Sequence, residues 1–209
     1  MDWLSTLSLA LGSAWTSGIN LYATIFILGL FQKIGIAKLP GGLEVLDSWW
    51  VIGIAASLYA IEFFADKVPY VDSIWDVVHT FIRVPAGALM AYASMSNFDP
   101  SVQAIAFLLG GGVAFSSHGT KTTARALANF SPEPVSNWIL SIVEDIIAIV
   151  GAILAVVAPL AIGFVVIVFL IAFLIMLPKI MRTLSRMFMA VNALFNRRDS
   201  FAAAFRKIN

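Results

Sequence analysis

Carboxylate, imidazole and basic side chains recur at helical spacing along a strongly hydrophobic chain. Between residues 72 and 83 they follow one another at steps of four, three and four residues, which places them on one face of a helix. The four residues are Asp72, Asp76, His79 and Arg83. This combination suits proton or cation handling, with the histidine as a relay that titrates near neutral pH. An ion-paired stripe that only joins helices is the structural alternative.

Other hydrophobic segments carry polar residues of the same kinds at similar spacing. A charged side chain at the centre of a bilayer costs about 2.5–3.5 kcal/mol, so we expect these groups to face one another around a hydrated or ion-paired interior. The further candidates for a substrate or ion pathway are Asn20, Glu62, Asp66, Ser117, His118, Lys121, Arg125, Asn137, Glu144 and Asp145.

The composition indicates which elements position these residues. Of 209 residues, 60% are hydrophobic and 12% are charged, whereas soluble domains carry about 25% charged residues. The polar surface of a soluble enzyme or a nucleic-acid-binding domain is therefore missing, and the net charge of +1 gives no attraction for nucleic acid. The chain has no cysteine, which excludes disulfides and thiol chemistry. We predict a protein whose solvent is the lipid bilayer.

Six segments have the roughly 20 apolar residues that a membrane-crossing helix needs. They are Leu4–Phe31, Ser48–Asp66, Asp72–Met95, Val102–Asn129, Val135–Ala158 and Leu160–Leu177. The predicted fold is an all-α, polytopic membrane helix bundle with six transmembrane helices, formed by residues 1–180 as a single unit and followed by a basic tail at residues 181–209.

The tail orients the chain. From Lys179 onward seven Lys or Arg residues stand against one acid, Asp199. The positive-inside rule therefore predicts that both termini of this multi-pass protein lie in the cytoplasm. The tail is expected to form an amphipathic helix on anionic lipid; a basic flank that stops transfer is the alternative.

The first and fourth segments are long, and each has a polar interruption. The interruptions lie at residues 16–20 and 116–122, the second after three consecutive glycines at 110–112. We expect two interrupted helices and a 3+3 inverted repeat of residues 1–96 and 97–180, which is typical of transporters. Close helix packing is the alternative explanation for the glycines, and a shift of about 65 residues aligns the third and fifth segments in a different duplication.

Two motifs resemble a known family. One is EFFADKVPYVD at residues 62–72, continuing through Asp76, His79 and Arg83; the other is KTTARALAN at 121–129, leading into SPEPVSN at 131–137 and Glu144-Asp145. Together they resemble the bacterial integral membrane family called domain of unknown function 4126, over nearly the whole chain. The resemblance implies a shared polar site and no particular activity. It also implies an arginine near Gly18, where this chain has Asn20 and so lacks a positive charge for an anion.

The leading hypothesis is a transporter or channel-like protein for a polar or anionic solute or a lipid phosphate, coupled to protons and needing no cofactor. Its carboxylates would handle protons or cations, and Arg83, Lys121 and Arg125 would contact an anionic substrate or keep the carboxylates ionised. One alternative is an intramembrane enzyme that acts on lipid headgroups through a metal held by Asp72, Asp76 and His79. Another is a scaffold subunit that transports nothing. The expected partners are lipid, a small polar solute or ion, and further copies of the chain.

Overall fold

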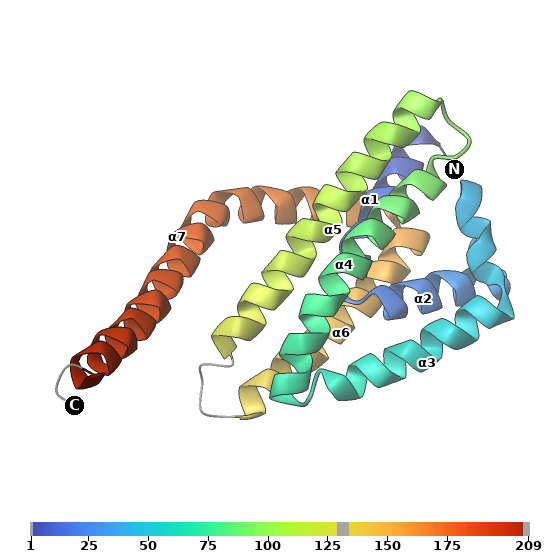
Figure 1. Ribbon diagram of the computed structural model, residues 1–209. Helices are drawn as coiled ribbons and strands as arrows, with labels where there is room; N and C mark the ends of the chain where they lie inside the picture. The colour runs from blue at the N-terminus through green and yellow to red at the C-terminus, as the bar shows by residue number, and fades with distance from the viewer. Residues whose placement is uncertain (1, 129–133, 207–209) are drawn as a thin grey trace. The chain divides into compact units, whose positions relative to one another are not determined.

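The computed structural model describes residues 2–128 and 134–206, in which the chain forms helices and no strand (Figure 1). The elements are α1 (Trp3–Ile19), α2 (Leu21–Lys33), the 3₁₀ helix η1 (Gly41–Asp47), α3 (Trp49–Ala65), α4 (Pro69–Ser94), α5 (Pro100–Ala128), α6 (Pro134–Val157) and α7 (Pro159–Arg206). Residues 129–133, where the fourth predicted segment ends and part of the second motif falls, lie outside the described residues.

The helices begin where the sequence has breakers. Pro69, Pro100, Pro134 and Pro159 are the first residues of α4, α5, α6 and α7. Proline suits this position because its ring presets a helical φ angle and its missing N–H would have no partner there. At the start of α1 the carboxylate of Asp2 accepts a hydrogen bond of 2.8 Å from the backbone N–H of Ser5, which caps the helix.

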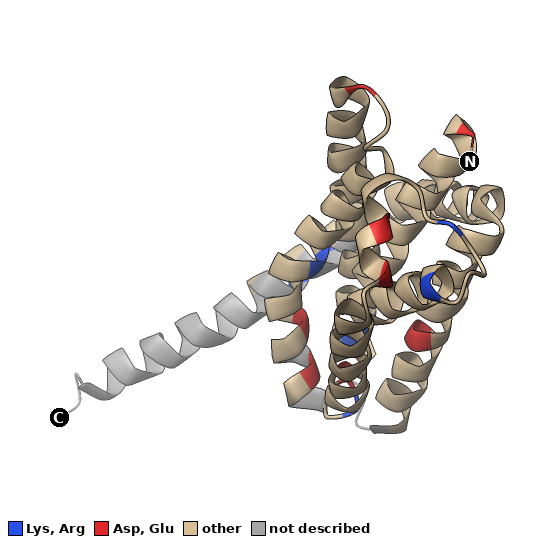
Figure 2. Cartoon of the chain, turned by 90° about the vertical axis from the view of Figure 1, so that its right-hand side faces the viewer, with Lys and Arg blue, Asp and Glu red and all other residues tan. Residues whose placement is uncertain are grey.

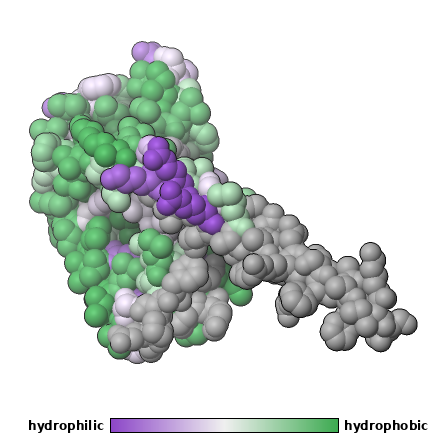
Figure 3. All heavy atoms as spheres, turned by 90° about the vertical axis from the view of Figure 1, so that its left-hand side faces the viewer, coloured by the Kyte–Doolittle hydropathy of each residue, from purple (hydrophilic) through white to green (hydrophobic). Residues whose placement is uncertain are grey.

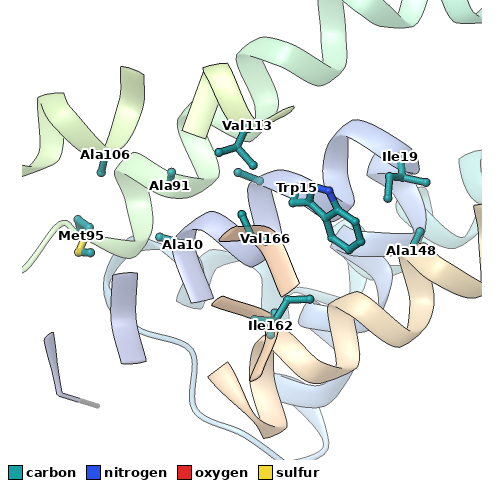
Figure 4. Packing of buried hydrophobic residues seen from close by; sticks show 12 residues of the cluster. Ala10, Trp15, Ile19, Ala91, Met95, Ala106, Val113, Ala148, Ile162 and Val166 are labelled. Atoms are coloured by element: carbon teal, nitrogen blue, oxygen red, sulfur yellow. The ribbon is translucent and has the colours of Figure 1, made fainter. Parts of the chain in front are cut away.

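Residues up to Leu170 form the first of two units. In this unit α4 and α5 pack along each other, α1 contacts α4, α5 and α6, and α2 packs against α3 and α6 (Figure 1). Small side chains fill many of the contacts, among them Ala10, Ala91 and Ala148, with Ile162 and Val166 from the start of α7 packed beside them (Figure 4). Small residues let helices approach closely, as is common in membrane bundles.

The second unit is the rest of α7, from Ile171 and described as far as Arg206. The sixth predicted segment was expected to end at Leu177, but the helix continues through Pro178 into the basic tail. The tail is therefore helical as predicted. Its side chains from residue 191 onward lie outside the description, so its amphipathic character stays a prediction.

Apolar residues dominate the face of the first unit drawn in Figure 3, and the apolar helices indicate a membrane protein. Among the described residues, three helices are long and apolar enough to cross a membrane: α5, residues 135–157 of α6, and residues 159–179 of α7. A fourth is added if η1 and α3, which meet at a bend of 76°, count as one span. The predicted count of six is not reached, because the first segment is divided into two short helices and the polar stripe of α4 lowers its hydropathy.

The structure confirms one predicted interruption and contradicts the other. The first segment breaks at Asn20, whose backbone is extended between α1 and α2, and Figure 1 shows α2 leaving at a large angle to α1. The fourth segment does not break, because α5 continues as one helix through the three glycines and the polar stretch that follows. At Gly110 an added Cβ would overlap the Cβ of Ala91 on α4. This glycine therefore serves close packing of α5 against α4.

Three helices cross closely at Gly87 on α4. A Cβ at this position would overlap the Cβ of Ala114 on α5 and lie 2.9 Å from Oγ of Ser17 on α1. Gly18 on α1 is equally confined, because its Cβ would overlap Ser117 Oγ and the carbonyl oxygen of Ala114. Close approach of α1, α4 and α5 therefore depends on glycine.

Gly87→Ala is expected to destabilise the protein by about 1–3 kcal/mol, because an added methyl group has no room at the crossing. Gly112→Ala is the matched control, since a Cβ there meets nothing within 4 Å. It should be neutral or stabilising by up to about 1 kcal/mol through helix propensity. The measurement is unfolding of both variants by detergent titration in mixed micelles, and equal stability of the two would contradict the close crossing.

Candidate functional site

All fourteen candidate pathway residues are buried in the first unit. They come from the α1–α2 break and from α3, α4, α5 and α6. Figure 2 marks acidic and basic positions on several helices of the bundle. Most of their side chains form one charge network, which consists of the carboxylates Glu62, Asp66, Asp72, Asp76, Glu144 and Asp145 and the cationic groups Arg83, Lys121 and Arg125.

Arg83 joins α4 to α3 within this network. Its guanidinium donates to the carboxylate of Glu62, and it lies 3.4 Å from Oδ1 of Asp76 on its own helix. Asp76 precedes Arg83 by seven residues, or two helical turns, so both side chains emerge from one face of α4. Two residues of the stripe predicted from the sequence, Asp76 and Arg83, therefore form an ion pair, and Arg83 extends it to Glu62 on α3.

Lys121 on α5 lies among four carboxylates. Its Nζ is 3.3 Å from Asp66 Oδ2, 3.6 Å from Glu62 Oε1, 3.7 Å from Glu144 Oε2 and 3.9 Å from Asp76 Oδ1. It also donates a hydrogen bond of 3.2 Å to the carbonyl oxygen of Ile19 at the end of α1. The ammonium group thus connects α3, α4 and α6 with the helix break, and none of its ion pairs is tight.

Arg125, one turn further along α5, makes closer contacts. Its Nη2 lies 2.9 Å from Asp66 Oδ2 and 2.5 Å from Glu144 Oε2, and its Nη1 donates to Asp72. Its Nε donates a second bond of 2.8 Å to Glu144. A planar guanidinium with five N–H donors holds several carboxylates in a set geometry. Arg125 therefore holds the end of α3, the start of α4 and the middle of α6 to α5.

The two histidines are held in opposite tautomers. Arg83 can only donate, so its contact of 3.2 Å with Nδ1 of His118 makes that atom an acceptor. His118 is then neutral, with the proton on Nε2, which donates to Thr80 Oγ1 at 2.7 Å. For His79, the carbonyl oxygen of Trp75 can only accept, so Nδ1 carries the proton at 2.8 Å and Nε2 accepts from the hydroxyl of Tyr22 at 3.0 Å.

The helix break brings backbone and amide groups to the network. The side-chain oxygen of Asn20 accepts from the N–H of Ala23 at 2.9 Å and caps α2. Its amide nitrogen donates to Asp145 Oδ1 on α6 at 3.0 Å. The carbonyl oxygen of Ile19 lies at the end of α1 and has no partner within the helix, and it accepts a hydrogen bond from Lys121 Nζ. Breaks of this kind hold ions and substrates in membrane transporters.

A cavity of about 300 Å³ reaches the network between α4 and α5. Its lining is Asp72, Asp76, Val77, Thr80, Thr122, Arg125 and Ala126. The volume is at the lower end of the range for pockets that hold small ligands. The polar lining combines carboxylates, hydroxyls and one guanidinium, which suits a small polar molecule or ion.

The network is not electrically balanced. Within the described residues, its six carboxylates face three buried cationic side chains and the partly buried Lys67, whose charge interacts with Asp66 and Asp145, which leaves an excess of two negative charges when the histidines are neutral and every carboxylate is ionised. Several carboxylate oxygens have no hydrogen-bond partner, including Glu62 Oε2, Asp66 Oδ1, Glu144 Oε1 and Asp145 Oδ2. Uncompensated buried charge is strongly unfavourable, so the network calls for protons or other cations.

Besides Asn20 and Asp145, which bond to each other, three predicted site residues stand apart from the ion pairs. His79 bonds to Tyr22 instead of a carboxylate, Ser117 donates to the carbonyl oxygen of Ala114 at the helix crossing, and Asn137 has no partner for either amide atom. The spacing of polar residues did not predict a role for Tyr22 or Thr80, which bond to His79 and His118.

The triad Asp72, Asp76 and His79, which was predicted to hold a metal in the alternative hypothesis, does not form a metal site. No group of three or more carboxylate or imidazole ligands within the described part of the chain is placed to hold one ion. Asp72 pairs with Arg125, and Asp76 lies between Arg83 and Lys121. Both carboxylates of the triad are therefore paired with cationic side chains.

Comparison with known proteins identifies one family. The family model described as Domain of unknown function (DUF4126) matches residues 7–179, which include every residue of the charge network. The curated proteins give no match to the chain, and neither do the solved structures. The match agrees with the resemblance noted in the sequence.

Proposed function

The chain belongs to the family described as Domain of unknown function (DUF4126), and we propose that it is a membrane transporter that couples the movement of a small polar solute to a cation or proton. The observation that carries this proposal is the buried, connected and electrically unbalanced charge network beside a helix break. Ionisable groups inside a membrane bundle are rare, and they mark ion pathways and proton relays.

The charge balance supports a cation more than an anion. Each cationic side chain of the network already lies within ion-pair distance of two or more carboxylates. An anionic solute or lipid phosphate would have to displace a carboxylate and would add to the excess negative charge. A proton or metal cation reduces that excess. The sequence hypothesis of an anionic solute is therefore replaced by a polar solute with a coupled cation.

Lys121 gives the coupling a physical basis. Its four ion pairs are all longer than 3.2 Å, and a lysine ammonium is a point charge on a flexible stem. When a cation or proton neutralises Glu144, Lys121 loses one attraction and shifts toward the carboxylates of α3 and α4. This shift alters the contacts that the network makes beside the cavity between α4 and α5, where the solute would bind.

The inverted repeat and the membrane orientation form part of the proposal. In the alignment of the two halves, residues 16–20 correspond to residues 117–121. Gly18 and Ser117, one from each of these stretches, lie in close contact. The basic residues after Lys179 favour the cytoplasmic side of the bacterial inner membrane for the C-terminus. With an even number of crossings, the N-terminus would lie on the same side.

The helical tail is proposed to bind anionic lipid at the membrane surface. Arg182 and Arg186 are exposed on α7, and each basic residue near an anionic bilayer contributes about 1 kcal/mol. A membrane-surface helix would keep the tail beside the bilayer on the side where the basic residues favour it.

The proposal is tested by transport in proteoliposomes. Proton and sodium gradients are applied with and without glycine, choline, glucose or inorganic phosphate, while a trapped dye and a membrane current report ion movement. A protein-dependent signal is expected for at least one combination. Glu144→Gln should abolish it, because the neutral amide no longer takes up the cation. Asp99→Asn, which changes an exposed carboxylate outside the network, should leave it unchanged.

Folding of each variant is checked by size-exclusion chromatography before reconstitution. If no combination exceeds protein-free liposomes, the protein is not a transporter of these classes, and a scaffold role becomes the better account. If Glu144→Gln and Asp99→Asn transport equally well, the network does not couple transport.

A further inference from the structure

A file of polar side chains without partners runs along α6. Both amide atoms of Asn137 and the hydroxyl of Ser141 lack a hydrogen-bond partner, although both residues are buried. The next positions on the same stripe, Glu144 and Asp145, each have one oxygen without a partner. Ser141 follows Asn137 by four residues, and Glu144 and Asp145 follow Ser141 by three and four residues, so these groups lie on one face of the helix.

This face points into the bundle. Glu144 uses its other oxygen for Arg125, and Asp145 uses its other oxygen for Asn20. The opposite face of α6 carries Ile139, Ile142 and Ile146, which are exposed as expected for contact with lipid. The unpartnered groups therefore line the inner side of α6 and lead from its first turn to the charge network.

Unpartnered polar groups in a protein interior are unfavourable, and in native proteins water or ions usually satisfy them. Apart from the amide nitrogen of Asn137, they are amide, hydroxyl and carboxylate oxygens, which are hard ligands of the kind that bind hard cations. The network at the inner end of the file has an excess of negative charge. The unpartnered oxygens and the excess negative charge would both be satisfied by a bound cation.

We infer that the α6 file, defined as Asn137, Ser141, Glu144 and Asp145, is a hydrated path that admits a monovalent cation to the charge network. It is separate from the cavity between α4 and α5, whose lining contains no residue of α6. The inference rests on the proposed function in one respect, since it assigns the coupled cation and the solute to different entrances. Sodium and the proton share the required chemistry.

The chain offers a direct test because it contains no cysteine. Asn137→Cys and Ser141→Cys are each made as single variants, with Ile139→Cys as the matched control on the lipid-facing side of α6. The purified proteins in nanodiscs are treated with a cationic and an anionic methanethiosulfonate reagent of similar size. Labelling is followed by mass spectrometry, so the result does not depend on transport.

Both file positions should react with the cationic reagent, and the control should not. The cationic reagent should react at least about tenfold faster than the anionic one, because a cleft of one charge sign concentrates counter-ions. Adding Asp145→Asn to Ser141→Cys should reduce this preference. Protection by sodium chloride, compared with choline chloride, would assign sodium as the occupant. A cationic preference without such protection would assign the proton.

Two results would overturn the inference. Labelling of Asn137→Cys and Ser141→Cys no faster than that of Ile139→Cys would show that the file is dry. Equal rates with the cationic and anionic reagents would show a water-filled crevice without selectivity for cations. Cation-selective labelling in a protein that gives no transport signal would support the hydrated path and refute the proposed transport function. The two proposals can therefore fail independently.

Discussion

Arg125→Ala is expected to lower the free energy of unfolding by about 3–5 kcal/mol, because removal of one partner leaves buried charges without compensation. Arg125 contacts three carboxylates, Asp66, Asp72 and Glu144, from three different helices. Without it the six carboxylates of the network would face two cationic groups instead of three. The change would be read from detergent-induced unfolding followed by tryptophan fluorescence.

Asp72→Asn is the informative comparison at the same contact. It removes one carboxylate from a network that has too many, and Arg125 keeps Asp66 and Glu144 as partners. We expect a loss below about 1.5 kcal/mol, the size of one hydrogen bond. Lys38→Ala, at an exposed position outside the network, should be neutral. If Arg125→Ala were as stable as Lys38→Ala, the network would not hold the helices together.

Lys121→Arg is expected to preserve the fold and abolish transport. The substitution keeps the positive charge among the four carboxylates, so the network stays as well compensated as before. A guanidinium, however, binds carboxylates through a rigid fork and holds its partners, as Arg125 does in this structure. The cationic group would no longer move between α3, α4 and α6 when a cation arrives. The transport signal should then fall to that of protein-free liposomes.

Two further variants complete this prediction. Arg125→Lys should have the opposite outcome, with lower stability, since an ammonium group cannot replace the several directed bonds of the guanidinium. Lys121→Met should lose both stability and transport, because the charge itself is removed. Transport at the native rate by Lys121→Arg would refute the role of a mobile ammonium group, whatever the state of the fold.

The candidate site was largely predictable from spacing. Asp76 and Arg83 share a helix face whatever surrounds the helix, because a period of 3.6 residues sets their direction. Low charge and long apolar segments likewise required buried charges to meet inside the bundle. Nine of the fourteen predicted residues do meet there, eight in ion pairs and His118 through its bond to Arg83, and Asn20 and Asp145 bond to each other. The break at Asn20 was marked by its polar, glycine-containing surroundings.

Other features depended on packing between helices. The glycines of the fourth segment resembled a second break, yet α5 is continuous because α4 packs against Gly110 and stabilises the helical backbone there. Spacing did not show that Asp72 would pair with Arg125, which lies 53 residues away in the sequence. Tyr22 became a partner of His79 only through the angle at which α2 leaves α1.

The sequence by itself determined that this protein is helical, is built for lipid and carries its charges on inward faces, since composition and periodicity are properties of the chain alone. The tertiary structure decided which charge meets which. Ion pairing depends on distances of 2.5–4 Å between side chains on different helices, and these distances are set by helix crossings such as that at Gly87. The excess of carboxylates over cations at one place, and with it the case for a cation, follows from that assembly.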